Sequence, residues 1–357
     1  MHILTIVGAR PQFIKAAPVC FALRDGGIRE TLVHTGQHYD AQMSDIFFVE
    51  IGIPRPHYNL GVGSGSHGAQ TAKMLSGIEE LLMKEKPDQV LVYGDTNSTL
   101  AGALAACKLH IPVAHVEAGL RSYNKTMPEE HNRILTDHCA NRLFCPTENA
   151  VQNLAKEGIR EGVCLAGDTM YDAVLMFSEK AERCSTVLDR LSLHSKAYYL
   201  ATVHRPYNTD NECSMRILIE AFGQMESVVV FPVHPRTRAR IADFRLALPS
   251  NLLMTDPVGY LDMLVLQRHA RVVLTDSGGI QKEACFVGTP CVTLRSETEW
   301  VETVQSGWNI LAWGSAESIL HAIAKQKSGG ERLPLLAYGD GCAAPRIAGA
   351  IRGGATQ

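Results

Sequence analysis

Short apolar runs alternate with longer amphipathic segments along nearly the whole chain, and this alternation restricts the possible folds more than any other feature. The segments between the runs, such as 68–85 and 97–109, repeat apolar residues with helical spacing. Strands that alternate with helices form parallel sheets whose faces are covered by the crossover helices. We therefore predict an α/β protein with strands at residues 2–7, 30–34, 89–93, 111–116 and 142–145, and then at 198–203, 228–233, 252–254, 271–275 and 290–294.

The alternation pauses at residues 165–197, where the sequence is polar and helix-like. A chain of 357 residues is also long for a single hydrophobic core. The two series of strands therefore predict two doubly wound, Rossmann-like domains that face each other across a cleft, with a boundary near Gly167–Asp168. Ligands bind such sheets beyond the carboxyl ends of the strands, so a candidate site must consist of residues found there.

Charge and composition exclude several classes of partner. The net charge of −3 gives no basic surface for nucleic acid. No run approaches the ~20 apolar residues of a membrane span, and the N-terminal MHILTIVGARPQFIK lacks the basic and long apolar regions of a signal peptide. The ten cysteines form no CxxC pair and are typical of small apolar residues in a reducing compartment. We expect a cytoplasmic protein with no metal site.

Three turns of the first half place charged residues directly after predicted strands. Residues 8–15 combine a glycine turn with Arg10 and Lys15, and this combination suits an anion-binding site. An equal alternative is that Gly8 and Pro11 only shape the turn and that the two cations are solvated. Asp95 follows 89–93 and could be a carboxylate of the site or only a helix N-cap. Glu117 follows 111–116, and a structural role is harder to assign because an unpaired buried charge is costly.

A helix beginning at Pro128 carries Glu129 and Arg133 four residues apart and therefore on one face. An ordinary capped helix with a surface ion pair is the alternative. In the second half, His204 and His234 follow successive strands, and two histidines at equivalent strand ends indicate more than packing.

The segment TDSGGIQKE (275–283) is typical of a strand, a small turn and a helix. Ser277, Gly278 and Gly279 would allow backbone amides to approach a phosphate. A P-loop pattern is absent, as is a GxGxxG turn after the first strand, so neither a P-loop nucleotidase nor a dehydrogenase is indicated. Carboxylates, a histidine and phosphate-suited turns favour proton transfer near an anionic leaving group.

The order and spacing of these motifs resemble one known family, the non-hydrolysing UDP-N-acetylglucosamine 2-epimerases. The resemblance covers residues 3 to about 310 and 338–347, and its motifs are GARPQFIKAAP, VYGDTNSTLAGALAA, HVEAGLRS, MPEEHNR, the His204–Arg205 strand end, HPRTR, TDSGGIQKEA, TEWVE and YGDGCAAPRI. It implies a fold of the glycosyltransferase-B type, with domains at 1–168 and 169–342 and a C-terminal helix at 343–357 that crosses back to the first domain. It also implies a homodimer that uses neither a metal nor a redox cofactor.

The resemblance further implies roles for individual residues. Arg10, Arg133, Ser277, Gly278 and Glu283 match positions that hold UDP, with Glu283 on the ribose, and Lys15 matches a lysine of the site. Asp95, Glu117, Glu129 and His204 match the catalytic group. The implied reaction removes the C2 proton and UDP to leave a 2-acetamidoglycal, after which UDP adds back and a proton returns on the opposite face.

Four motifs resemble the branch acting on UDP-2,3-diacetamido-2,3-dideoxyglucuronate more than the branch with GTRPE and TERPE: GARPQF, HTGQHYD (34–40), HPRTR and TEWVE (298–302). Arg236 and Arg238 could meet the carboxylate of that sugar. We therefore predict that the uronate is converted to its manno epimer for bacterial surface polysaccharide synthesis, with UDP-N-acetylglucosamine and UDP-N-acetylmannosamine as the alternative pair. Tyr207 stands where the family usually has glutamate, which puts the support of His204 in doubt.

Three other functions remain as alternatives. A UDP-sugar glycosyltransferase of the same fold would need an acceptor-binding face, which the sequence does not display. A hydrolysing epimerase, which would release free mannosamine and UDP, is not distinguished by the motifs. A non-catalytic sugar-nucleotide sensor would have no reason to retain all four residues of the catalytic group.

Overall fold

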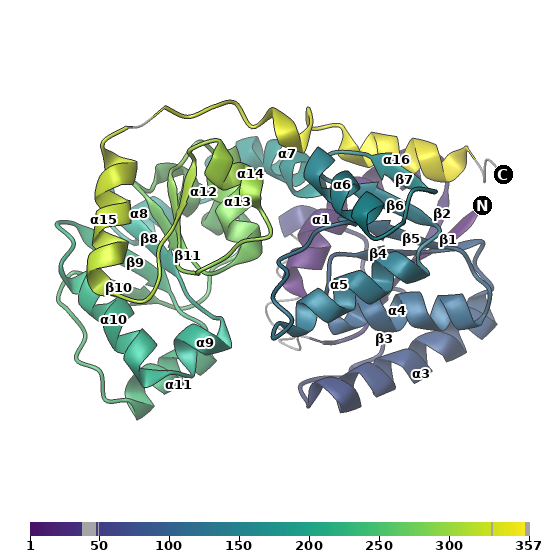
Figure 1. Ribbon diagram of the computed structural model, residues 1–357, viewed down its shortest axis with the longest axis horizontal. Helices are drawn as coiled ribbons and strands as arrows, with labels where there is room; N and C mark the ends of the chain where they lie inside the picture. Colours follow the sequence, from purple (N-terminus) through teal and green to yellow (C-terminus); the bar gives the residue numbers. More distant parts are fainter. Residues whose placement is uncertain (38–47, 49, 330, 354–357) are drawn as a thin grey trace. The chain divides into compact units, whose positions relative to one another are not determined.

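The computed structural model describes residues 1–37, 48, 50–329 and 331–353. The chain divides into two compact units (Figure 1): unit 1 comprises Met1–Met176 and Leu336–Gln357, and unit 2 comprises Phe177–Leu335. Across those described residues, no helix is both long enough and apolar enough to span a lipid bilayer.

Unit 1 contains a seven-stranded parallel sheet in the order β3-β2-β1-β4-β5-β6-β7. Its strand order reverses between the neighbours β1 and β4, which creates the topological switch point where such sheets bind ligands. The strands are β1 (His2–Val7), β2 (Arg29–His34), β3 (Tyr58–Asn59), β4 (Gln89–Tyr93), β5 (Val113–Val116), β6 (Arg142–Cys145) and β7 (Val163–Leu165).

The two faces of this sheet are covered by different helices. Leu4 and Ile6 of β1 pack with α3 (His67–Glu85) and α4 (Asn97–Lys108), whereas α1 (Arg10–Asp25) contacts β1, β2 and β4. Gly102 of α4 permits a close approach, because a Cβ there would lie 2.6 Å from the Cδ1 atom of Ile6. Beyond α4, α5 (Pro128–Cys139) packs against it, and α6 (Glu148–Lys156) contacts β6 and β7.

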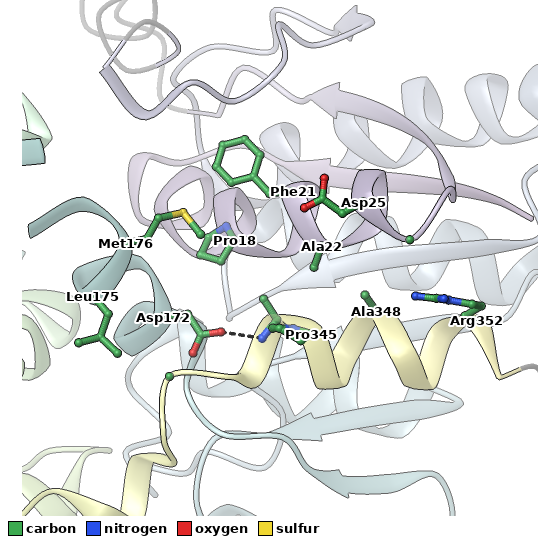
Figure 2. Close-up of a pocket in the computed structure, with 13 residues that line it drawn as sticks. Pro18, Phe21, Ala22, Asp25, Asp172, Leu175, Met176, Pro345, Ala348 and Arg352 are labelled. Atoms are coloured by element: carbon green, nitrogen blue, oxygen red, sulfur yellow. Dashed lines mark hydrogen bonds between the residues drawn. The ribbon is translucent and has the colours of Figure 1, made fainter. Parts of the chain in front are cut away.

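The C-terminal segment completes unit 1. Helix α16 (Ala343–Arg352) packs against α1, and its N-terminus is capped by Asp172 of α7 (Thr169–Cys184). The Asp172 carboxylate accepts hydrogen bonds from the backbone N–H groups of Ala343 (3.2 Å) and Ala344 (2.7 Å). Figure 2 shows Asp172 pointing toward the start of α16. A groove of about 640 Å³ between α1, α7 and α16 is lined mainly by apolar side chains, among them Phe21 and Met176.

These boundaries differ from those expected at residues 168 and 343. The units divide within α7, after Met176, because the first half of this helix belongs to unit 1. The chain returns to unit 1 at Leu336, before the short 3₁₀ helix Leu336–Tyr338.

Unit 2 contains a six-stranded parallel sheet in the order β10-β9-β8-β11-β12-β13, with a second switch point between β8 and β11. Its apolar core joins β8, β9 and β11 to α10 and α15. The strands are β8 (Tyr198–Thr202), β9 (Val228–Pro232), β10 (Leu252–Thr255), β11 (Val273–Thr275), β12 (Cys291–Thr293) and β13 (Asn309–Leu311). The helices are α8 (Val187–Arg190), α9 (Pro206–Thr209), α10 (Glu212–Gly223), α11 (Pro235–Asp243), α12 (Tyr260–His269), α13 (Gly278–Phe286), α14 (Val301–Gln305) and α15 (Ala316–Lys327).

Candidate active site

The turn after β1 is tied to the end of β4 by Gln12. The Gln12 Oε1 atom accepts hydrogen bonds from the N–H groups of Gly8 (2.8 Å) and Ala9 (3.0 Å). Its Nε2 atom donates to the Tyr93 carbonyl (2.8 Å) and to the Thr99 hydroxyl (3.0 Å). One buried amide therefore fixes the two turns that flank the switch point of unit 1.

Gly8 itself lies too close to its neighbours for any side chain. A Cβ there would be 2.0 Å from the Ser98 hydroxyl and 2.2 Å from the Thr35 hydroxyl. The glycine expected to open an anion-binding turn is thus required by packing. It brings the start of α1, which carries Arg10 and Lys15, against the residues that follow β4.

Glu117 and Lys15 form a buried ion pair beside the turn after β4. A Cβ placed on Gly94 would be 3.3 Å from the Glu117 carboxylate and 3.5 Å from the Lys15 ammonium, which locates the pair next to Gly94. Glu117 also has a φ of +74°, which is unusual for a residue with a side chain. Strained backbone of this kind costs about 1–3 kcal/mol and is concentrated at functional sites.

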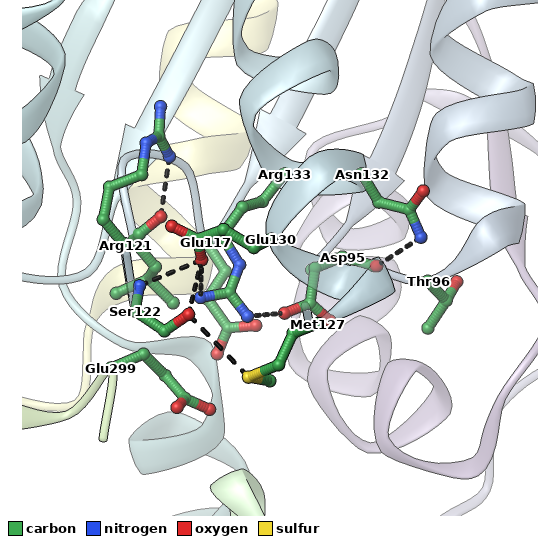
Figure 3. Close-up of polar contacts among 12 residues, drawn as sticks. Asp95, Thr96, Glu117, Arg121, Ser122, Met127, Glu130, Asn132, Arg133 and Glu299 are labelled. Atoms are coloured by element: carbon green, nitrogen blue, oxygen red, sulfur yellow. Dashed lines mark hydrogen bonds and ion pairs between the residues drawn. The ribbon is translucent and has the colours of Figure 1, made fainter. Parts of the chain in front are cut away.

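Asp95 lies at the same end of the sheet and is held by α5 (Figure 3). Its Oδ2 atom is 2.5 Å from a guanidinium nitrogen of Arg133, and its carbonyl accepts a hydrogen bond from the Asn132 side chain (3.0 Å). Arg133 is buried, whereas the Asp95 side chain is 31% exposed. The alternative that Asp95 caps α4 is wrong, because the N-cap is Thr96, whose hydroxyl accepts from the Thr99 N–H.

The two adjacent glutamates of α5 have different surroundings. Glu130 is buried and accepts hydrogen bonds from Ser122 (N–H at 2.9 Å, hydroxyl at 2.8 Å) and the Tyr123 N–H (2.8 Å), and it pairs with Arg133 at 3.2 Å (Figure 3). Glu129 is half-buried on the first turn of the helix. The alternative of a surface ion pair on α5 does not hold for Arg133, because that side chain is buried.

Behind the turns after β4 and β5 lies a buried network centred on Asp137. His115 places Nδ1 at 2.7 Å from the Asp137 carboxylate and Nε2 at 2.7 Å from the Gly94 carbonyl, and because both partners accept, both ring nitrogens are placed to donate. Asp137 also accepts from the Gly119 N–H (3.1 Å) and from Arg121 (2.7 Å). The network therefore ties together the turns that carry Asp95 and Glu117.

The charge of Asp137 is compensated inside the protein. Burial by itself would raise the pKa of this carboxyl, but the hydrogen bond and charge of His115, followed by those of Arg121, outweigh burial and lower the pKa. Arg121 in turn pairs with Glu157 through two contacts of 2.7 Å.

In unit 2, His204 follows β8 and meets a carboxylate that follows β11. Asp276 is fully buried, and its Oδ1 atom is 3.4 Å from Nδ1 of His204. The same carboxylate accepts from the N–H groups of His204 and Arg205 and from the Asn208 side chain. These residues lie at the switch point of unit 2, as Asp95 does in unit 1.

The turn expected to hold phosphate is the N-terminus of α13. Ser277 is the N-cap, and its hydroxyl accepts from the Ile280 N–H at 3.5 Å. A Cβ on Gly278 would lie 2.5 Å from the Glu299 carboxylate, so the turn accepts no larger residue without rearrangement. Gly279 follows in the first helical turn, whose N–H groups have no acceptor within the helix. Glu283 is buried further along α13 and accepts from Gln267 at 2.8 Å.

His234 has a local structural role. Its Nδ1 atom accepts from the Arg236 N–H at 3.2 Å and caps α11. Arg236 pairs with Asp210 at 2.6 Å and Arg238 with Asp256 at 3.1 Å, both on exposed surface.

The structure thus groups Arg10, Lys15, Asp95, Glu117, Glu129 and Arg133 on the strand ends and first two helical turns of unit 1, and His204, His234, Ser277, Gly278, Gly279 and Glu283 on those of unit 2. Sequence reasoning missed four partners: Gln12, Asn132, Asp137 and Asp276. Asp276 was detectable, because it directly follows a predicted strand inside a motif already singled out. In HTGQHYD, residues 38–40 lie outside the described residues, whereas Gln37 accepts from the Ser98 hydroxyl at 2.7 Å. Within the described part of the chain, no three His, Cys, Asp or Glu side chains are grouped to hold a metal ion.

Comparison with known proteins gives consistent matches along the chain. The family model for UDP-N-acetylglucosamine 2-epimerase matches residues 22–352. A UDP-N-acetylglucosamine 2-epimerase homolog of Methanococcus maripaludis is 53% identical, with 99% of both chains covered. The UDP-2,3-diacetamido-2,3-dideoxy-D-glucuronate 2-epimerase of Pseudomonas aeruginosa is 48% identical, with 98% of both covered. The crystal structure of Methanocaldococcus jannaschii UDP-GlcNAc 2-epimerase in complex with UDP-GlcNAc and UDP is 43% identical, has a TM-score of 0.94, and covers 99% of this chain and 100% of that chain.

Proposed function

The chain belongs to the UDP-N-acetylglucosamine 2-epimerase family, and from this premise we propose that it inverts C2 of a UDP-linked N-acetylated hexosamine without hydrolysing it. The observation that carries the proposal is the pairing of Asp95 with Arg133 and of Glu117 with Lys15 at the switch point of unit 1. Two carboxylates with adjacent cations suit proton transfer next to a departing diphosphate. The proposed partners are the UDP-sugar, UDP and a second copy of the chain.

The proposed reaction proceeds by elimination and re-addition. The C2 proton is not adjacent to a carbonyl, so a base alone would remove it poorly. Loss of UDP provides the driving force: the base takes the C2 proton, the C–H electron pair forms the C1–C2 double bond, and the C1–O bond breaks with its electrons on UDP. The resulting 2-acetamidoglycal then regains UDP at C1 and a proton at C2 on the opposite face.

Two faces of C2 must be served, so more than one acid/base group is required. The proposed catalytic group is Asp95, Glu117, Glu129 and His204. Departing UDP would be stabilised by Arg10, Lys15, Arg133 and the α13 N-terminus with Ser277, Gly278 and Gly279, and Glu283 would contact the ribose. The buried Gln12 amide and the network around Asp137 support this assignment, because they hold the turns of the two principal carboxylates in place.

We favour UDP-2,3-diacetamido-2,3-dideoxyglucuronate as the substrate. The motifs of the branch and the 48% identity with the Pseudomonas aeruginosa enzyme support this choice. Arg236 and Arg238 are engaged in exposed ion pairs, which are worth only about 0–1 kcal/mol, so a sugar carboxylate could replace Asp210 or Asp256. His234 would join them on the substrate side. The alternative is UDP-N-acetylglucosamine, which the TM-score of 0.94 with the Methanocaldococcus jannaschii enzyme supports.

Proton NMR in D2O, with each UDP-sugar offered separately to the purified protein, tests the proposal. We expect deuterium at C2 together with a manno-configured UDP-sugar, and the substrate that reacts identifies the branch. Exchange without free mannosamine would exclude the hydrolysing reaction. If neither sugar exchanges, the epimerase proposal fails and a transferase or a sensor becomes the better interpretation.

A further inference from the structure

His204 presents a problem that the sequence leaves open. The neighbouring position 207 holds tyrosine where the resemblance implies glutamate, so the usual acid beside this histidine is missing. Partial burial, and then the charge of Asp276, raise the pKa of the Tyr207 hydroxyl above its ordinary value. A tyrosinate therefore does not take the place of the glutamate near neutral pH.

A different carboxylate lies against the histidine. The Oδ1 atom of Asp276 is 3.4 Å from Nδ1 of His204, and the Asp276 side chain is fully buried while that of His204 is 48% exposed. The Nδ1 edge of the imidazole thus lies beside a buried carboxylate, while about half of the His204 side chain remains exposed.

The position of Asp276 is fixed by more than this contact. Its carboxylate accepts from the N–H groups of His204 (3.1 and 3.2 Å) and Arg205 (3.0 Å) and from the Asn208 side chain (3.0 Å). His204 follows β8 and Asp276 follows β11, and these two strands are direct neighbours in the sheet. Thr202 is paired with Thr275, and their hydroxyl oxygens are 2.6 Å apart. The sheet therefore determines the geometry of the pair.

We propose that Asp276 is the positioning residue of His204: it accepts the Nδ1 proton, so that Nε2 is the nitrogen presented for proton transfer. The inference rests on the proposed function only for what His204 does to substrate. A carboxylate at Nδ1 selects the tautomer and orientation of an imidazole and stabilises its protonated form. Asp276 does not contact substrate in this role.

Other charged or titratable groups surround the same turn and remain unchanged in the test. They are Arg205 and Tyr207 on the side of α9, and Arg295 and Glu297 after β12. Because these groups form a constant background, a difference between wild type and an Asp276 variant reports the carboxylate itself.

The test is NMR of histidine-labelled full-length protein without substrate, with the His204 signal assigned by its loss in His204→Gln. In wild type we expect the neutral ring to carry its proton on Nδ1. In Asp276→Asn we expect the His204 pKa to fall by about one unit, the lower end of the effect of an opposite charge at this distance, because the ring is half exposed. The matched control is Glu212→Gln, which removes an exposed carboxylate paired with Arg216 and should leave the His204 pKa in place.

Kinetics extend the test to the reaction. We expect Asp276→Asn to lower kcat at least tenfold with KM changed less than threefold, and to move the histidine limb of the pH–rate profile in the same direction as the NMR titration. An Nε2–H tautomer in wild type overturns the inference even if the variant fails to fold, and so does an unchanged His204 pKa in a folded variant. The NMR measurements need no turnover, so their result stands even if the protein does not epimerise a UDP-sugar. Failure of this inference and failure of the proposed function can therefore be told apart.

Discussion

Two consecutive residues of α5 illustrate how the surroundings of a side chain, and not its type, decide its role. Glu129 and Glu130 are chemically identical and adjacent. Glu130 is buried and bonded to Ser122, Tyr123 and Arg133, whereas Glu129 is half-buried on the first helical turn. A carboxylate with its hydrogen-bonding capacity already occupied suits a structural role and is poorly suited to transfer a proton.

We expect the substitution of glutamate by glutamine to have opposite effects on stability and activity at these two positions. Glu130→Gln should lower the free energy of unfolding by about 1–3 kcal/mol, because the buried Arg133 and two N–H groups lose a charged partner. Glu129→Gln should leave the melting temperature within a degree but lower kcat by roughly 10²–10⁴-fold if the residue acts as an acid or base. Thermal unfolding and steady-state kinetics of both variants provide the check. Loss of kcat in a fully stable Glu130→Gln protein would contradict this division of roles.

At the scale of elements, the network around Asp137 connects α5 with the turns after β4 and β5. Arg121 and Asp137 are paired at 2.7 Å and removed from solvent, so removing either one leaves the buried charge of the other uncompensated. The network therefore acts as a clamp on the carboxyl ends of two neighbouring strands.

The clamp predicts a specific dependence of stability on pH. Since the folded pKa of Asp137 is lowered, its contribution to stability is present above the unfolded pKa of about 4 and is lost as the pH falls through the folded value. Asp137→Asn should be about 3–5 kcal/mol less stable than wild type at pH 7, and this difference should shrink below pH 4.

Urea unfolding at several pH values between 7 and 3 measures the difference. Asp25→Asn, which removes an exposed carboxyl, is the matched control and should track wild type throughout. A constant difference between Asp137→Asn and wild type over the whole range would show that ionisation of Asp137 does not stabilise the fold.

At the scale of the whole molecule, the two units differ in how many segments of the chain form them. Unit 2 is one continuous segment, residues 177–335, whereas unit 1 needs both ends of the sequence. Helix α16 buries Ile347 and Ile351 and is anchored by Asp172, and the Ala350 carbonyl accepts a hydrogen bond from Arg142.

This difference predicts different behaviour of fragments. Residues 177–335 alone should unfold cooperatively, because every strand of their sheet is present. Residues 1–176 alone should be about 3–6 kcal/mol less stable than the same segment linked to 336–357, because two buried isoleucines are each worth about 1.5–3 kcal/mol. Circular dichroism with urea tests both. Equal stability of the linked and unlinked forms of unit 1 would show that α16 is dispensable.

The sequence alone predicted most of the architecture. All ten predicted strands are confirmed, with ends that shift by no more than two residues. The short edge strands β3, β7 and β13 were missed, because they are only partly buried, whereas the equally short β11 and β12 are fully buried central strands. The boundary between the units lies within α7 and not before it as predicted. The helical pattern of α7 is uninterrupted at the point where the helix passes from one unit to the other, so the sequence carries no signal of the boundary there.

What the sequence determined by itself is the local order: periodicity specifies strands and helices, and parallel topology then brings their carboxyl ends, with Asp95, Glu117 and His204, to one edge of each sheet. Only the tertiary structure decided which polar groups pair. Thr96 and not Asp95 caps α4, Glu130 and not Glu129 is enclosed, and His115 meets Asp137 as His204 meets Asp276. The physical reason is that a hydrogen-bonding partner is selected by distance in space, and these partners come from separate strands and helices that only packing brings together.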